Sequence, residues 1–131
     1  MVIDTSALIA ITLVEPSRRV LLDHIEAASE RVISSVSLLE AGMVLRARLG
    51  ATAILALYQL VEQLGAEIVP FDGFQARAAI RAFGRFGKGM GHPARLNFGD
   101  CAVYALAEFR GEPLLAIGND FAATDLVVVS P

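Results

Sequence analysis

The sequence contains little cysteine and few charged residues, and both shortages limit what the protein can be. Its 131 residues include one cysteine, which cannot form an internal disulfide and is consistent with a reducing cytoplasm. One cysteine with two histidines also supplies no plausible zinc site. Only 19% of the residues are charged, whereas 55% are hydrophobic. This balance excludes disorder and favours a sheet that is buried on both faces.

Long hydrophobic runs are also missing, although the mean hydropathy is +0.58. The longest uncharged run, 49–61, has 13 residues, whereas a membrane-spanning helix needs about 20 apolar residues. The amino terminus carries Asp4 inside its first apolar segment and has no basic region before it, unlike a signal peptide. We therefore expect a cytoplasmic protein, and since no repeat or linker interrupts residues 1–131, a single domain.

Acidic residues are absent from 73–99, while five of the 11 basic residues fall in that stretch. These five are Arg77, Arg81, Arg85, Lys88 and Arg95. The net charge of −3 argues weakly against nucleic-acid binding, but this clustering answers the objection. Arginines at four-residue spacing are also typical of a solvated helix face. We therefore predict phosphate contacts only for Lys88 and Arg95.

Apolar spacing and turn residues predict strands that alternate with helices. Strands are expected at 2–3, 32–34, 68–70, 114–117 and 127–129, and helices at 6–13, 15–28, 38–49, 52–64, 73–85 and 99–110. Strands separated by helices imply parallel pairing through right-handed crossovers. The predicted fold class is therefore α/β, a three-layer α/β/α sandwich with a mainly parallel sheet.

Four acidic residues lie at predicted junctions between strands and helices. Asp4 follows the first strand, Asp120 follows the strand at 114–117, and Glu40 and Asp100 lie near the starts of helices. The carboxyl ends of parallel strands are where ligands bind in such sheets, so we expect one shared pocket. Carboxylates are hard ligands that suit Mg²⁺ or Mn²⁺ rather than zinc. The sequence therefore predicts a divalent-cation site.

Four short motifs contain these acids, and their order and spacing form a recognisable series. They are Val2-Ile3-Asp4-Thr5-Ser6-Ala7, Leu39-Glu40-Ala41, the stretch 87–101 with its His92-Pro93-Ala94-Arg95-Leu96-Asn97-Phe98-Gly99-Asp100-Cys101, and Asn119-Asp120-Phe121. No motif is specific alone. Together they make the chain resemble PIN-domain ribonucleases, and among these the VapC toxins of type II toxin–antitoxin modules, over essentially its whole length.

The resemblance implies a metal-dependent endoribonuclease that acts as the toxin of such a module. Metal-activated water would cleave RNA, leaving 3′-hydroxyl and 5′-phosphate ends, with one or two ions bound. The implied partners are an RNA substrate, a cognate antitoxin that covers the acidic pocket, and a second copy in a homodimer. The apolar helices at 38–49 and 52–64 are candidate interface material.

Within this interpretation, the acids are the predicted catalytic residues and metal ligands. Asp4 and Asp100 are assigned as direct ligands, and Glu40 and Asp120 complete the pocket directly or through water. Many family members place a second acid directly before the last one and a lysine a little earlier, whereas this chain has Asn119 and Ile117. Asp125 is therefore an alternative to Asp120.

Neighbouring polar residues could support the ligands or simply cap helices. Thr5 and Ser6 could contact metal-bound water or the phosphate, or cap the helix that follows them. Asn97, three residues before Asp100, could orient that ligand, but we favour capping. Glu40 has its own alternative, because it stands three residues after Ser37 in the spacing of a capping box.

Two other functions compete with the nuclease. A non-catalytic module of the same fold could bind RNA or a protein partner, although the complete set of acids argues against it. A phosphatase could use Asp4 as its nucleophile. The loop of haloacid-dehalogenase-type enzymes would carry a second Asp two residues later, where this chain has Ser6, which makes the phosphatase the less favoured alternative.

Overall fold

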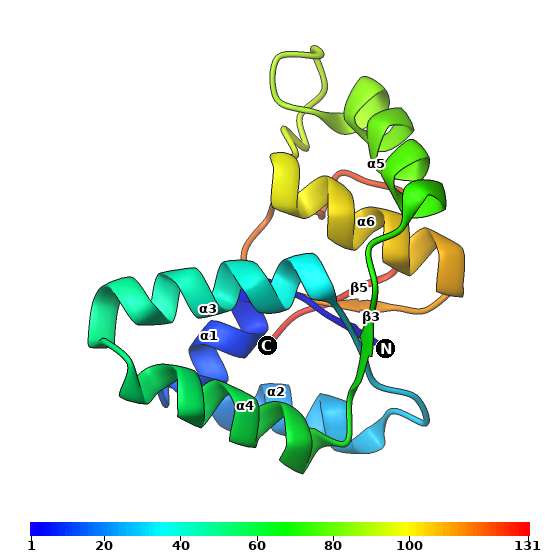
Figure 1. Ribbon diagram of the computed structural model, residues 1–131. Coiled ribbons are helices and arrows are strands. Elements are labelled where there is room, and N and C mark those ends of the chain that lie inside the picture. The colour runs from blue at the N-terminus through cyan, green and yellow to red at the C-terminus, as the bar shows by residue number, and fades with distance from the viewer.

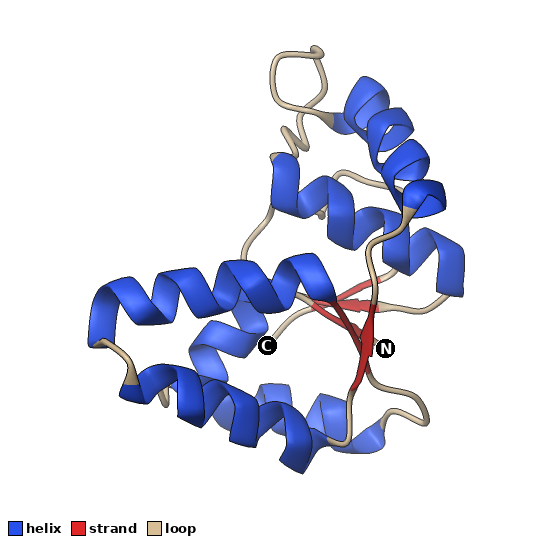
Figure 2. Ribbon diagram, viewed as in Figure 1, coloured by secondary structure: helices blue, strands red, loops and turns tan.

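The computed structural model describes residues 1–131 and contains one five-stranded parallel sheet (Figures 1 and 2). The strands are β1 (Val2–Ile3), β2 (Val32–Ser34), β3 (Glu67–Val69), β4 (Leu114–Leu115) and β5 (Val128–Val129). Their order across the sheet is β3-β2-β1-β4-β5, and every neighbouring pair is parallel. The amino-terminal strand β1 is therefore the central strand.

Six helices cover the two faces of this sheet. They are α1 (Thr5–Thr12), α2 (Arg18–Ala27), α3 (Ser35–Leu49), α4 (Thr52–Leu64), α5 (Gly73–Phe86) and α6 (Phe98–Arg110). Residues of α1 to α4 form one hydrophobic core with the sheet, and residues of α5 and α6 form a second core on its other face (Figure 1). The predicted α/β/α sandwich is confirmed. No helix combines the length and the apolar character required to cross a bilayer.

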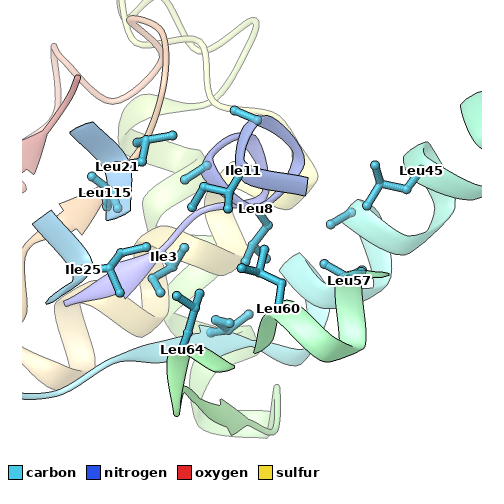
Figure 3. Close-up of a cluster of buried hydrophobic side chains, with 14 of the residues drawn as sticks. Ile3, Leu8, Ile11, Leu21, Ile25, Leu45, Leu57, Leu60, Leu64 and Leu115 are labelled. Atoms are coloured by element: carbon cyan, nitrogen blue, oxygen red, sulfur yellow. The ribbon is translucent and has the colours of Figure 1, made fainter. Parts of the chain in front are cut away.

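Successive side chains of the short strands contribute to the two cores in alternation. Ile3, Ile33 and Leu115 point into the core beneath α1 to α4, which Figure 3 shows around Ile3, Leu8 and Leu57. Their preceding residues, Val2, Val32 and Leu114, belong to the core beneath α5 and α6. Successive residues of a strand point to opposite faces, and all six of these side chains are almost completely buried.

Several element boundaries differ from the predicted ones by a few residues. The third strand begins at Glu67 and ends before Pro70, which cannot donate a backbone hydrogen bond to a neighbouring strand. Helix α2 begins at Arg18, so Pro16 lies in the turn before it. Helix α3 begins at Ser35, directly after β2. The strand-to-helix junctions that carry Asp4 and precede Glu40 therefore contain almost no loop.

Replacing either of two leucines of α4 by alanine should have very different effects on the stability of the fold. Leu57 is fully buried, whereas Leu55 is 60% exposed on the same helix. Leu57→Ala should lower the free energy of unfolding by about 2–5 kcal/mol, because it removes buried methyl groups and leaves a cavity. Leu55→Ala should change it by about 0.5 kcal/mol or less. Urea denaturation of both variants measures this, and equal losses would contradict the packing described for α4.

Candidate active site

Asp4 lies at the end of the central strand and is only 7% exposed. It is the N-cap of α1, where its Oδ2 accepts hydrogen bonds from the Ser6 amide at 2.9 Å and from Ser6 Oγ at 2.6 Å. Ser6 Oγ also accepts a bond from the Ile117 amide at 2.9 Å. The Ser6 hydroxyl thus joins the first acid to the segment that follows β4. The cap of α1 is Asp4 itself, rather than Thr5 or Ser6.

Glu40 lies on α3, and the capping-box explanation for it is wrong. The N-cap of α3 is Ser34, whose side chain accepts a hydrogen bond from the Val36 amide, so Ser37 lies inside the helix. The carboxylate of Glu40 instead accepts a hydrogen bond at its Oε2 from Thr5 Oγ1, at 2.9 Å. The side chain of Glu40 is therefore directed toward the start of α1, beside Asp4.

Asp100 lies in the first turn of α6 and forms a capping box with Asn97. The Asn97 amide donates to Asp100 Oδ2 at 2.8 Å, and the Asp100 amide donates to Asn97 Oδ1 at 2.9 Å. The capping role favoured for Asn97 is confirmed. One carboxylate oxygen of Asp100 is thereby fixed at the helix start, which holds the side chain in one orientation.

The pKa values show that these acids act on one another. The pKa of Asp100 is raised to about 6, mainly by burial and in smaller part by the charges of Asp4, Asp120 and Glu40, against the opposing hydrogen bond from Asn97. Burial is also the main cause of the raised pKa of Asp4, with a smaller contribution from Glu40. The structure therefore brings the other three predicted acids within electrostatic reach of Asp100.

Asp120 and Asp125 differ in their surroundings. Asp120 is exposed after β4, and its charge acts on Asp100. Asp125 accepts hydrogen bonds from the Tyr104 hydroxyl at 2.6 Å and from Arg85 at 2.7 Å. These two bonds lower the pKa of Asp125. In this structure the charge of Asp125 is therefore paired with Arg85, whereas the charge of Asp120 acts on Asp100.

The chemistry of the donor set is suited to a divalent cation. Glu40 and Asp100 each use one carboxylate oxygen for the hydrogen bonds above, and the other oxygen accepts no hydrogen bond from the protein. None of the four acids belongs to an ion pair. No three potential ligands lie together at metal-binding distances. Hard oxygens with uncompensated negative charge match Mg²⁺ or Mn²⁺.

The loop 87–97 between α5 and α6 carries the two predicted phosphate contacts and projects from the top of the molecule in Figure 1. Pairing between Gly87 and Leu96 closes the loop. Lys88 and Arg95 are exposed on it and form no salt bridge. His92 instead packs edge-on against Phe86, and its Nδ1 accepts a hydrogen bond from the Ala94 amide.

Gly99 is a residue of the site that the analysis of the sequence missed. It is buried in the first turn of α6, and its backbone lies against the carboxylate of Glu40. The available signal was a glycine directly beside a candidate ligand, inside a helix where glycine lowers helix stability.

Known proteins resemble this chain along nearly its full length. The PIN domain family model matches residues 1–126. Ribonuclease VapC28 of Mycobacterium tuberculosis is 45% identical over 124 residues, covering 95% of this chain and 93% of that protein. Ribonuclease VapC of Mycolicibacterium smegmatis is 41% identical over 129 residues, covering 98% and 99% of the two chains.

Solved structures share the fold at lower sequence identity. The crystal structure of Mycobacterium tuberculosis VapC20, described as a sarcin–ricin loop cleaving toxin, aligns with a TM-score of 0.79 at 19% identity, covering 99% of this chain and 98% of that one. A toxin–antitoxin complex from Klebsiella pneumoniae aligns with a TM-score of 0.71 at 20% identity, covering 98% and 94%. These likenesses establish the fold of the chain.

The raised pKa of Asp100 predicts that Asp100→Asn stabilises the metal-free protein at neutral pH. The unfolded carboxyl ionises near 3.8 and the folded one near 6, so the wild type loses stability as the pH rises between these values and stays lower above them. Asparagine keeps an oxygen for the Asn97 amide but carries no charge. We expect a gain of about 1–2 kcal/mol at pH 7.5, discounted for the partial exposure of Asp100.

Chemical denaturation in EDTA at pH 7.5 and near pH 4 measures this difference. The stabilisation should be present at the higher pH and largely absent at the lower one, which lies close to the pKa of the unfolded carboxyl and well below that of the folded one. A variant that is less stable than the wild type at pH 7.5 would contradict the proposed repulsion.

Proposed function

Because this chain belongs to the PIN-domain family, we propose that it is a VapC-type, metal-dependent endoribonuclease acting in the cytoplasm as the toxin of a type II toxin–antitoxin module. One observation carries this proposal. The carboxylates at the carboxyl edge of the sheet keep oxygens without protein donors and have no cationic partner. The identity to curated VapC ribonucleases supports the choice of RNA as the substrate.

We assign the cation, Mg²⁺ or Mn²⁺, to Asp4 and Asp100 first, with Glu40 and Asp120 completing the ligand set directly or through water. A bound divalent cation lowers the pKa of water and neutralises charge that develops on a phosphodiester. The hydroxyl of Ser6 holds Asp4 in place through its 2.6 Å hydrogen bond. Since the Ser6 hydroxyl also contacts the Ile117 amide, it keeps the segment before Asp120 close to the first ligand.

Asp4 and Asp100 have complementary surroundings for this role. The buried Asp4 is shielded from solvent, which strengthens its attraction for a cation. The Asn97 amide keeps one oxygen of Asp100 occupied and leaves the other for the metal. The raised pKa values of both carboxyls indicate that their ionised forms lack a positive partner, and a divalent cation would supply it.

Two protein partners complete the proposal. We propose a cognate antitoxin that covers the acidic pocket, for which a planar arginine side chain would be a suitable ligand. We also propose a homodimer in which α3 and α4 contribute the interface. Leu39, Met43 and Tyr58 on these helices are 63%, 64% and 57% exposed, and they line one shallow groove. Exposed apolar groups gathered in this way mark interaction surfaces.

Cleavage of a mixed cellular RNA pool by the purified protein tests the nuclease. We expect cuts with 5′-phosphate ends in Mg²⁺ or Mn²⁺ and none in EDTA. Asp4→Asn should lower the rate by roughly 100-fold or more, since even partners of metal ligands contribute about 10- to 100-fold. Equal activity of the variant and the wild type would contradict the site. A folded wild type without any cleavage would favour a binding module instead.

RNA binding should depend on salt through Lys88 and Arg95. In the Asp4→Asn background, which binds without cleaving, replacing either residue by alanine should reduce the salt slope for a single-stranded RNA by about 0.7. Fluorescence anisotropy between low and moderate salt measures this slope. Arg18→Ala is the matched control, because Arg18 is exposed on α2 in the opposite helical layer. If the salt slope changes equally when Lys88, Arg95 or Arg18 is replaced by alanine, the loop is excluded as the phosphate contact.

A further inference from the structure

The first turn of α6 lies so close to the Glu40 carboxylate that a Cβ at Gly99 would displace it. A Cβ at this position would lie 2.5 Å from Glu40 Oε2, 3.1 Å from its Cδ and 3.2 Å from Oε1. Cβ atoms essentially never come within 3.0 Å of another residue's heavy atoms. Only the hydrogen of a glycine leaves room for the Glu40 carboxylate in its present place.

The backbone does not otherwise require glycine at this position. Gly99 is absent from the glycines with positive φ, and it lies inside the helix that runs from Phe98 to Arg110. Glycine is unfavourable inside a helix because of its large loss of conformational freedom on folding. The close approach of Glu40 is therefore the feature of the structure that accounts for glycine here.

The same carboxylate oxygen is held from a second direction. Thr5 Oγ1, in the first turn of α1, donates a hydrogen bond to Glu40 Oε2 at 2.9 Å. Oε2 therefore lies between α1 and α6, and Glu40 Oε1 accepts no hydrogen bond from the protein. Three helices, α1, α3 and α6, thus determine the orientation of one carboxylate whose charge acts on both Asp4 and Asp100.

We infer that Gly99 and Thr5 are positioning residues that fix Glu40 and keep its Oε1 available to a cation beside Asp4 and Asp100. This inference rests on the proposed metal-dependent function. Gly99 acts by leaving space and Thr5 acts by donating a hydrogen bond. Neither residue needs to touch the metal or the RNA. The two act on one oxygen, so disturbing either one should change metal binding through Glu40.

Gly99→Ala tests the steric half of the inference. The added Cβ must displace the Glu40 carboxylate, and we expect Mn²⁺ to bind roughly 10- to 100-fold more weakly, the range found for residues that orient metal ligands. Electron paramagnetic resonance of free Mn²⁺ gives the affinity without RNA. Gly84→Ala on α5 is the matched control, because a Cβ there meets no atom within 4 Å, and its Mn²⁺ affinity should equal that of the wild type.

Combining Gly99→Ala with Glu40→Asp distinguishes positioning from general damage. The shorter side chain of Glu40→Asp withdraws the carboxylate from the added Cβ, so Gly99→Ala should cost little further affinity in that background. Residues in contact are expected to be non-additive in this way. If Gly99→Ala lowers the Mn²⁺ affinity equally in the presence and absence of Glu40→Asp, the inference is overturned.

Two substitutions at Thr5 test the hydrogen-bonding half and keep the inference falsifiable if Gly99→Ala does not fold. Thr5→Val removes the hydroxyl at similar volume and should weaken Mn²⁺ binding, whereas Thr5→Ser keeps the donor and should retain most of the affinity. Unchanged binding in Thr5→Val would overturn the role of Thr5. A wild type that binds no Mn²⁺ and cleaves no RNA would refute the proposed function itself. A fully active wild type with an equally active Gly99→Ala would refute only the inference.

Discussion

The burial of several carboxylates close together at one edge of the sheet is the constraint on which the rest of this structure depends. Asp4 is almost completely buried, and Asp100 has its pKa raised to about 6. Holding such groups together costs free energy unless something positive meets them. The two hydrophobic cores on either side of the sheet supply the opposing stability, and they fix the strand ends from which the acids project.

The protein meets this constraint with neutral donors instead of cations. Ser6 donates hydrogen bonds to Asp4, the Thr5 hydroxyl donates one to Glu40, and the Asn97 amide donates one to Asp100. Some of its positive groups form ion pairs elsewhere, as in the contacts between Arg85 and Asp125 and between Arg110 and Glu67. An arginine in the pocket would stabilise the empty protein but would also compete with a metal ion for the same oxygens. The absence of such a partner agrees with the nuclease proposed above.

Local signals along the chain predicted most of the fold and the four candidate acids. β-branched pairs such as Val2-Ile3 and Val32-Ile33 marked central strands, and Gly65 and Gly111 marked helix ends, where both adopt the left-handed conformation. Asn97 was correctly assigned as a cap because its partner lies three residues away. The capping box predicted for Ser37 and Glu40 failed, because Ser34 at the strand end had already capped α3. Spacing alone does not determine which of two serines begins a helix.

The sequence by itself determined which residues are candidates for the chemistry, since carboxylates between strands and helices are the side chains of this chain that suit a hard cation. The tertiary structure alone decided how they are held. The contacts of Thr5 with Glu40, of Ser6 with the Ile117 amide, and of Glu40 with Gly99 join residues 35, 111 and 59 positions apart. It also distinguished Asp120 from Asp125, by pairing Asp125 with Tyr104 and Arg85. Contacts between residues so far apart in the sequence depend on how strands and helices pack against each other, and no local pattern in the chain encodes that packing.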